Sequence, residues 1–170
     1  LSTGEAPSVI VEDRYEDFIQ YLQKQDTVEA ENFWRDYLDG VEEATLLPFV
    51  DSKRDRTKGG VEYRKEELLL EDNLHTALQD FAQKNRLTVN TMIQGVWAYL
   101  LSCYTGQDDP VYGVTVAGRP TELAGSEMRV GLYINTLPLR TSVKGEQQVS
   151  EWLAELQEGH SKAREHSYTP

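Results

Sequence analysis

Apolar residues recur at helical spacing in five stretches of the chain and favour strands in three shorter ones. Helices are predicted over residues 14–24, 26–40, 72–84, 88–104 and 148–165, and strands over residues 61–70, 111–117 and 132–139. Helices that alternate with strands in this order predict an α/β fold, a layered sheet with covering helices. Residues 1–13 are expected to be a linker or a cut end, and residues 42–60 a mobile, solvated loop.

The most regular pattern follows Thr88, which can cap a helix. Its apolar residues form one stripe at helical period: Val89, Met92, Ile93, Val96, Trp97, Leu100, Leu101 and Tyr104. We expect this helix to pack on the central sheet, with Gly95 beside the stripe allowing a close backbone approach. Cys103 also lies beside the stripe and is expected to be a buried, inert thiol, since no histidine is near it in sequence.

The other helices show the same mixture of caps and apolar faces. Asp26, with Glu29 three residues later, has the form of a capping box, and Asp72 can cap the third helix. In the first helix Tyr15, Phe18, Ile19 and Leu22 follow helical spacing. The residues expected to form the apolar faces of the later helices are Ala30, Phe33, Trp34, Tyr37 and Leu38, then Leu74, Ala77, Leu78, Phe81 and Ala82, and finally Val149, Trp152, Leu153, Leu156 and Ala163. The strand at residues 61–70 alternates apolar with charged residues, which indicates an edge or half-exposed position.

The central stretch joins two β-rich segments, Val111–Ala117 and Leu132–Leu139, through a connector that runs from Gly118 to Gly131. Such a connector is either a functional loop or simply a long link between strands. Asn135 and Thr136 are hydrogen-bonding side chains that interrupt an apolar strand. Asn135 could line a site or tie a backbone group, and these two interpretations stay open.

Charge and composition restrict the class of protein. The net charge of −12 disfavours binding to nucleic acid or to an anionic membrane. No apolar run has transmembrane length. The single cysteine, Cys103, excludes an internal disulfide framework, and a cytoplasmic location is expected. The sequence contains no metal-ligand spacing.

The central stretch resembles the late core motif of condensation domains from nonribosomal peptide synthetases. The matching pieces are Val114–Pro120, Glu127 and Val130–Arg140, joined by Phe33–Leu38 near the start and Arg164–Pro170 at the end. The resemblance covers essentially the whole chain, but only the middle and later part of such a domain.

This resemblance implies one lobe of a chloramphenicol-acetyltransferase-like fold, in which two similar lobes form a V around a tunnel. Residues 14–170 would be the C-terminal lobe, incomplete at both ends. The family forms amide bonds between a donor acyl thioester and an acceptor aminoacyl thioester. Both are carried on phosphopantetheine arms of carrier proteins, so no directly bound cofactor is implied. The implied partners are the N-terminal lobe and the upstream and downstream carrier proteins.

The family's catalytic His-His-x-x-x-Asp-Gly motif has no match here, so no catalytic residue is assigned. His75 is expected to be exposed, His160 to be buried with its hydrogen bonds satisfied, and His166 to end a helix. The chain would instead supply a tunnel wall, for which the candidates are Gly118, Arg119, Tyr133, Asn135 and Thr136. Arg119 is also expected to form an ion pair with Glu122 or Glu127.

Three alternatives remain at this point: an epimerisation domain, a cyclisation domain, and a non-catalytic interaction or docking domain. An apolar lobe face left without its partner predicts self-association of the isolated chain.

Overall fold

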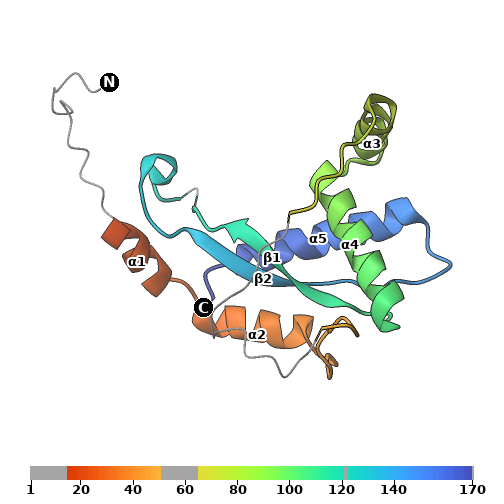
Figure 1. The fold of residues 1–170 in the computed structure, drawn as a ribbon. Helices are drawn as coiled ribbons and strands as arrows, with labels where there is room; N and C mark the ends of the chain where they lie inside the picture. The colour runs from red at the N-terminus through yellow and green to blue at the C-terminus, as the bar shows by residue number, and fades with distance from the viewer. Residues whose placement is uncertain (1–14, 51–64, 121, 170) are drawn as a thin grey trace, which may run out of the picture.

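Two antiparallel strands and five α-helices form the structure, which is a computed structural model that describes residues 15–50, 65–120 and 122–169. Figure 1 shows α3 and the connector rising from the same side of the strands, at opposite ends of the molecule. The elements are α1 Tyr15–Gln23, α2 Thr27–Tyr37, α3 Asp72–Asn85, α4 Val89–Thr105, β1 Val111–Ala117, a 3₁₀ turn Ser126–Met128, β2 Ile134–Arg140 and α5 Val149–Glu165. The α/β fold class is confirmed. The expectations for residues 1–13 and 51–64 lie outside the described residues.

The two strands pair in a register that runs from Val111 opposite Arg140 to Ala117 opposite Ile134. One face of this pair packs on α5. Leu139 is 0% exposed and joins Leu153 and Leu156 of α5 in the main core. β2 runs from Ile134 to Arg140 and so ends one residue beyond the predicted strand.

Helix α4 starts where Thr88 predicts, with Thr88 Oγ1 accepting a hydrogen bond from the Thr91 backbone N–H at 3.0 Å. Its packing differs from the prediction. α4 packs on α5, and its buried residues are Thr91, Met92, Gln94, Gly95, Ala98 and Leu101. Only Met92 and Leu101 of these belong to the predicted apolar stripe. Gly95 lies so close to Leu153 that a Cβ there would collide with it, which confirms the close approach.

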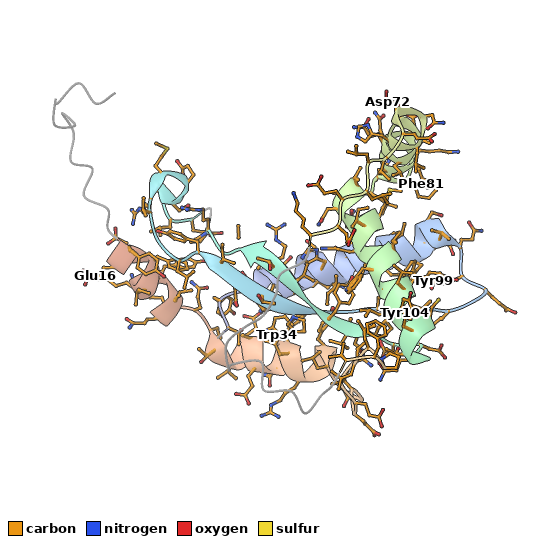
Figure 2. The ribbon with its side chains drawn as sticks, viewed as in Figure 1. Glu16, Trp34, Asp72, Phe81, Tyr99 and Tyr104 are labelled. Atoms are coloured by element: carbon orange, nitrogen blue, oxygen red, sulfur yellow. The ribbon has the colours of Figure 1, made fainter. Side chains whose placement is uncertain are left out.

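Six members of the predicted apolar stripe of α4 are therefore exposed rather than buried: Val89, Ile93, Val96, Trp97, Leu100 and Tyr104. We call this set the α4 stripe. Figure 2 labels Tyr104, and also Tyr99, on this helix. Cys103, predicted to be buried, is exposed as well. The pattern identified the helix correctly, but the face that packs on α5 is the one that carries Gly95, which lies against Leu153 and Trp152.

The segment before α3 also departs from the prediction. Residues 65–70 form no strand, and Leu68 and Leu69 are 85% and 92% exposed. The N-cap of α3 is Glu71, without a side-chain hydrogen bond, whereas Asp72 is the first helical residue. Leu74 and Ala77 are exposed, so the buried face of α3 is limited to Ala82 with the half-buried Leu78 and Phe81.

Helix α2 begins as predicted, because the Asp26 side chain accepts hydrogen bonds from the backbone N–H groups of Val28 and Glu29. It lies beside β2. The hydroxyl of Tyr37 accepts from the Arg140 backbone N–H at 2.9 Å. The Arg140 side chain donates to the Asp109 carboxylate at 2.6 Å and to the carbonyl oxygen of Asp39 at 2.7 Å. This network fixes the end of α2 to the end of β2.

Candidate functional site

A cavity of about 540 Å³ lies where β1 ends and β2 begins, between α1 and the last turns of α5. Four of the five predicted site residues line it: Gly118, Arg119, Tyr133 and Asn135. The fifth, Thr136, is exposed and does not line this cavity. The strand register explains the gathering, since Ala117 pairs with Ile134 and thereby brings both ends of the connector together.

Arg119 is held by the connector itself. Its guanidinium donates to the carbonyl oxygens of Ser126 and Arg129, the latter at 2.9 Å, and lies 4.1 Å above the ring centre of Tyr133. The expected ion pair with Glu122 or Glu127 is wrong. A planar guanidinium stacks on an aromatic face while its edge donates hydrogen bonds, so the connector folds around this one side chain.

Asn135 ties the last described residues to β2. Its amide N–H₂ donates to the carbonyl oxygens of Ser167 and Thr169, at 2.8 and 3.1 Å, and its side-chain oxygen accepts from the Thr136 backbone N–H at 2.8 Å. Because all three hydrogen bonds of the Asn135 side chain go to backbone groups, Asn135 has a scaffold role. Because Asn135 also lines the cavity, it positions one wall of that cavity.

Tyr133 is 3% exposed and forms the base of an aromatic group with α1. Its ring centre is 4.7 Å from that of Phe18 and 5.4 Å from that of Tyr15. The backbone N–H of Gly118 donates to the Tyr133 carbonyl oxygen, and a Cβ on Gly118 would lie 3.0 Å from that oxygen. The Tyr133 hydroxyl is buried and has no hydrogen-bond partner among the described residues.

Two elements of the cavity could not be found from the sequence. The first is α1, whose Tyr15, Phe18, Tyr21 and Leu22 line the cavity. The helical spacing of the residues in this segment indicated only a helix. The second is the segment Ser161–Thr169, whose hydroxyls and Arg164 form the opposite wall. Since α1 meets the connector only through tertiary contacts, such as Arg129 to Asp17 at 2.9 Å, the local pattern held no signal for it.

The three histidines do not form a common site in the structure: His75 lies on α3, His160 on α5 and His166 at the end of α5. His75 is exposed on α3, as predicted. His166 is the C-cap of α5 and stacks on Phe33 with 4.2 Å between ring centres, which confirms its structural role. His160 is half-buried, but its Nε2 has no partner among the described residues, so the expectation of satisfied hydrogen bonds is wrong. Burial, helped by the Arg164 charge, lowers its pKa.

Comparison with known proteins decides the family. A sequence model described as the Condensation domain matches residues 1–170. A linear gramicidin synthase of Brevibacillus parabrevis is 45% identical over 170 residues, which are 100% of this chain and 3% of that protein. The chain belongs to the condensation domain family. Bacitracin synthase 3 of Bacillus licheniformis also resembles this condensation-domain chain, with 34% identity over 91% of it and 2% of the synthase.

Solved structures of condensation domains share this fold and confirm the expected chloramphenicol-acetyltransferase-like architecture. The first condensation domain of the CDA synthetase matches with a TM-score of 0.70 and 22% identity, covering 96% of this chain and 35% of that one. The X-domain from teicoplanin biosynthesis matches with a TM-score of 0.65 and 26% identity, covering 91% and 34%.

The condensation-domain chain thus spans about a third of the length of these solved structures and only a few per cent of the synthetases. Within the described residues, no helix is both long and apolar enough to cross a membrane. No group of three or more His, Cys, Asp or Glu side chains comes together there as a metal site.

Proposed function

We propose that this chain supplies one wall of the substrate tunnel of a nonribosomal peptide synthetase condensation domain, as the C-terminal lobe over residues 14–170. The observation that carries the proposal is the gathering of Gly118, Arg119, Tyr133 and Asn135 around one cavity. The family membership of the whole chain supports the same conclusion. The reaction would join a donor acyl thioester to the amino group of an acceptor aminoacyl thioester.

In that reaction the amine nitrogen attacks the thioester carbonyl carbon, a C–N bond forms and the C–S bond breaks. The amine must lose a proton, and the thiolate leaves and takes one up. The family's His-His-x-x-x-Asp-Gly motif has no match in this sequence and the described histidines do not line the cavity, so we place the base for this proton transfer in the remainder of the domain. The role of this chain is to position the substrates, which by itself lowers the barrier of a two-substrate reaction.

The cavity lining fits an extended, amphipathic arm such as phosphopantetheine carried by a partner protein. Ala117 and Ile134 offer apolar contacts, and the hydroxyls of Ser161 and Ser167 offer hydrogen bonds along the opposite wall. Arg119 and Asn135 act indirectly, since each holds a backbone segment of the wall in place. Upstream and downstream carrier proteins and the N-terminal lobe are therefore the proposed partners, in the cytoplasm.

The test is an assay with carrier-bound donor and acceptor thioesters on the condensation domain that contains residues 1–170. We expect Ile134→Trp to fill the cavity and slow amide formation by about tenfold or more, with an unchanged melting temperature. Val149→Trp is the matched control, because Val149 is 61% exposed, close to the 63% of Ile134, and lies outside the cavity lining.

Residues 1–170 alone should give no amide product. Amide formation by the chain alone would overturn the assignment of the base to another polypeptide. Equal rates for the two tryptophan variants would show that this cavity is not the tunnel.

A second candidate function is an interaction domain without catalysis. It is favoured by the likeness of this chain to the X-domain from teicoplanin biosynthesis. A second solved structure that this chain matches is described as the complex of that X-domain with OxyB. A folded full-length domain that forms no amide from any carrier-bound pair would favour this candidate.

A further inference from the structure

The two long walls of the cavity at the connector differ in chemistry. One wall comes from the end of α5 and the residues after it, where the hydroxyls of Ser161 and Ser167 line the cavity. The other comes from α1, which Figure 1 shows at the end of the strands away from α4. The α1 residues of the lining share one helix face and are mostly aromatic: Tyr15, Phe18, Tyr21 and Leu22. We call these four residues the α1 wall.

The α1 wall offers no free hydrogen-bonding group to a ligand. The Tyr15 hydroxyl donates to the carbonyl oxygen of Leu132 at 2.9 Å. The Tyr21 hydroxyl lies 3.5 Å from Oε2 of Glu122, and the other two members have no polar side-chain atom. An arm that carries amide groups would leave those amides without partners on this wall, which costs free energy. A hydrocarbon or aromatic group loses nothing there.

Several contacts hold the α1 wall in place. Phe18 is 7% exposed, and its ring centre lies 4.7 Å from that of Tyr133. The ring of Tyr15 lies directly on the backbone at Gly131, where an added Cβ would collide with it. On α1, the Asp17 carboxylate pairs with Arg129 of the connector at 2.9 Å. A wall fixed in this way selects by size, because it cannot close on the space that a small ligand leaves empty.

We propose that the α1 wall is a subsite for a large apolar side chain on a carrier-bound aminoacyl group, and that it selects such groups over small ones. This inference rests on the proposed function, because it takes the cavity to be part of the substrate tunnel. The arm would lie along Ser161 and Ser167, and the side chain of the substrate would lie on α1. Either the donor or the acceptor supplies that side chain, and the experiment separates the two sources.

The test measures substrate preference in the condensation domain that contains residues 1–170. In one series the acceptor is a leucyl or an alanyl thioester on its carrier protein, with the donor kept constant. In the other series the donor is varied in the same way and the acceptor is kept constant. We expect kcat/KM for the leucyl substrate to exceed that for the alanyl substrate by about tenfold or more in one series, a usual discrimination for an apolar pocket.

Variants of Leu22 assign this preference to the α1 wall. Leu22→Ala should lower the leucyl-to-alanyl ratio by about fivefold or more, because the leucyl side chain loses its contact. Leu22→Trp should lower the ratio as well, because it fills the space that the larger side chain needs. Ile19→Ala is the matched control, since Ile19 is on the same helix, 38% exposed and outside the cavity lining, and should leave the ratio unchanged. Because each ratio compares two substrates on one sample, a partial loss of folded protein cancels.

The series in which the ratio responds to Leu22 identifies the donor or the acceptor as the source of the side chain. Ratios that neither Leu22 variant changes, in both series, would overturn the proposal. If Ile134→Trp slows amide formation while the Leu22 variants leave both ratios unchanged, the subsite is refuted and the tunnel role stands. Equal rates for Ile134→Trp and Val149→Trp together with unchanged ratios would overturn both.

Discussion

The β2 side and the β1 side of the molecule are built in different ways. On the β2 side, α2, β2, α5 and residues 166–169 are joined by hydrogen bonds between distant segments, such as Trp34 Nε1 to Thr169 Oγ1 at 3.1 Å and Asn135 to Ser167. On the β1 side, the α4 stripe and the outer strand edge are exposed. The contrast teaches that the β2 side finds its hydrogen-bond partners within this chain, whereas the described residues leave much of the apolar surface on the β1 side uncovered.

The largest expected effect on stability compares a buried core residue with an exposed residue of the α4 stripe. Leu156 is 2% exposed in the main core, whereas Ile93 in the α4 stripe is 53% exposed. Leu156→Ala should lower the free energy of unfolding of the chain by about 2–5 kcal/mol. Ile93→Ala should change it by less than about 0.5 kcal/mol, as at other exposed positions. Urea unfolding followed by circular dichroism measures both, and similar losses would mean that the α4 stripe is covered in solution.

The next effect concerns the ion pair at the end of β2. Arg140→Leu removes the pair with Asp109 and the bonds to the carbonyls of Tyr37 and Asp39. We expect a loss of roughly 2 kcal/mol, a moderate value because the Asp109 side chain is 40% exposed. Arg35→Leu is the control, since its pair with Glu31 is far more exposed and should contribute little. A neutral Arg140→Leu in thermal unfolding would contradict the role given to this network.

A smaller effect is expected where α5 caps α4. The Gln157 side-chain oxygen accepts from the Thr88 N–H and the Thr91 hydroxyl, both at 2.9 Å, and its amide donates to the Arg86 carbonyl oxygen at 3.0 Å. Gln157→Leu should lower the unfolding free energy by about 1 kcal/mol. Gln157→Glu should recover most of it, because a carboxylate accepts the same two bonds at a helix N-terminus. Equal losses in the two variants, measured by urea unfolding, would show that the contact is only one of packing.

The smallest effect is a pH dependence from His160. Its pKa in the folded chain lies below the ordinary value of 6.5, mainly because of burial. The unfolded chain then binds the proton more readily, so stability is complete above about pH 6.5 and falls as the pH drops toward the folded-state pKa. His160→Gln should flatten this part of the curve of unfolding free energy against pH. An unchanged slope in the variant would assign the dependence to other groups.

Local chemistry predicted most helix positions, because caps and periodicity are local signals. Asp26 and Thr88 cap their helices as expected, and the ends of α1, α4 and α5 lie within a residue or two of the predicted ones. The two central strands were also predicted, although β2 starts at Ile134 rather than Leu132. Here the local preference and the tertiary structure agree.

The predictions were wrong where the structure of a segment depends on contacts with residues distant in the sequence. The alternation in residues 65–70 favoured a strand, but a strand needs a neighbour, and these residues have none among the described part of the chain. The α4 stripe looked like a core face, yet α5 packs on the opposite side through Gly95. Four of the five candidate site residues were found because the family motif held them, whereas the aromatic residues of α1 carried no comparable signal.

The closed edge of β2 has a consequence for aggregation. Fibrils grow when every added molecule offers a fresh strand edge to the next one. Here Pro138 and the occupied N–H groups at Thr136 and Arg140 leave the outer edge of β2 with few free donors for another strand. The outer edge of β2 should therefore be a poor seed for fibril growth, even in concentrated solutions of the isolated chain.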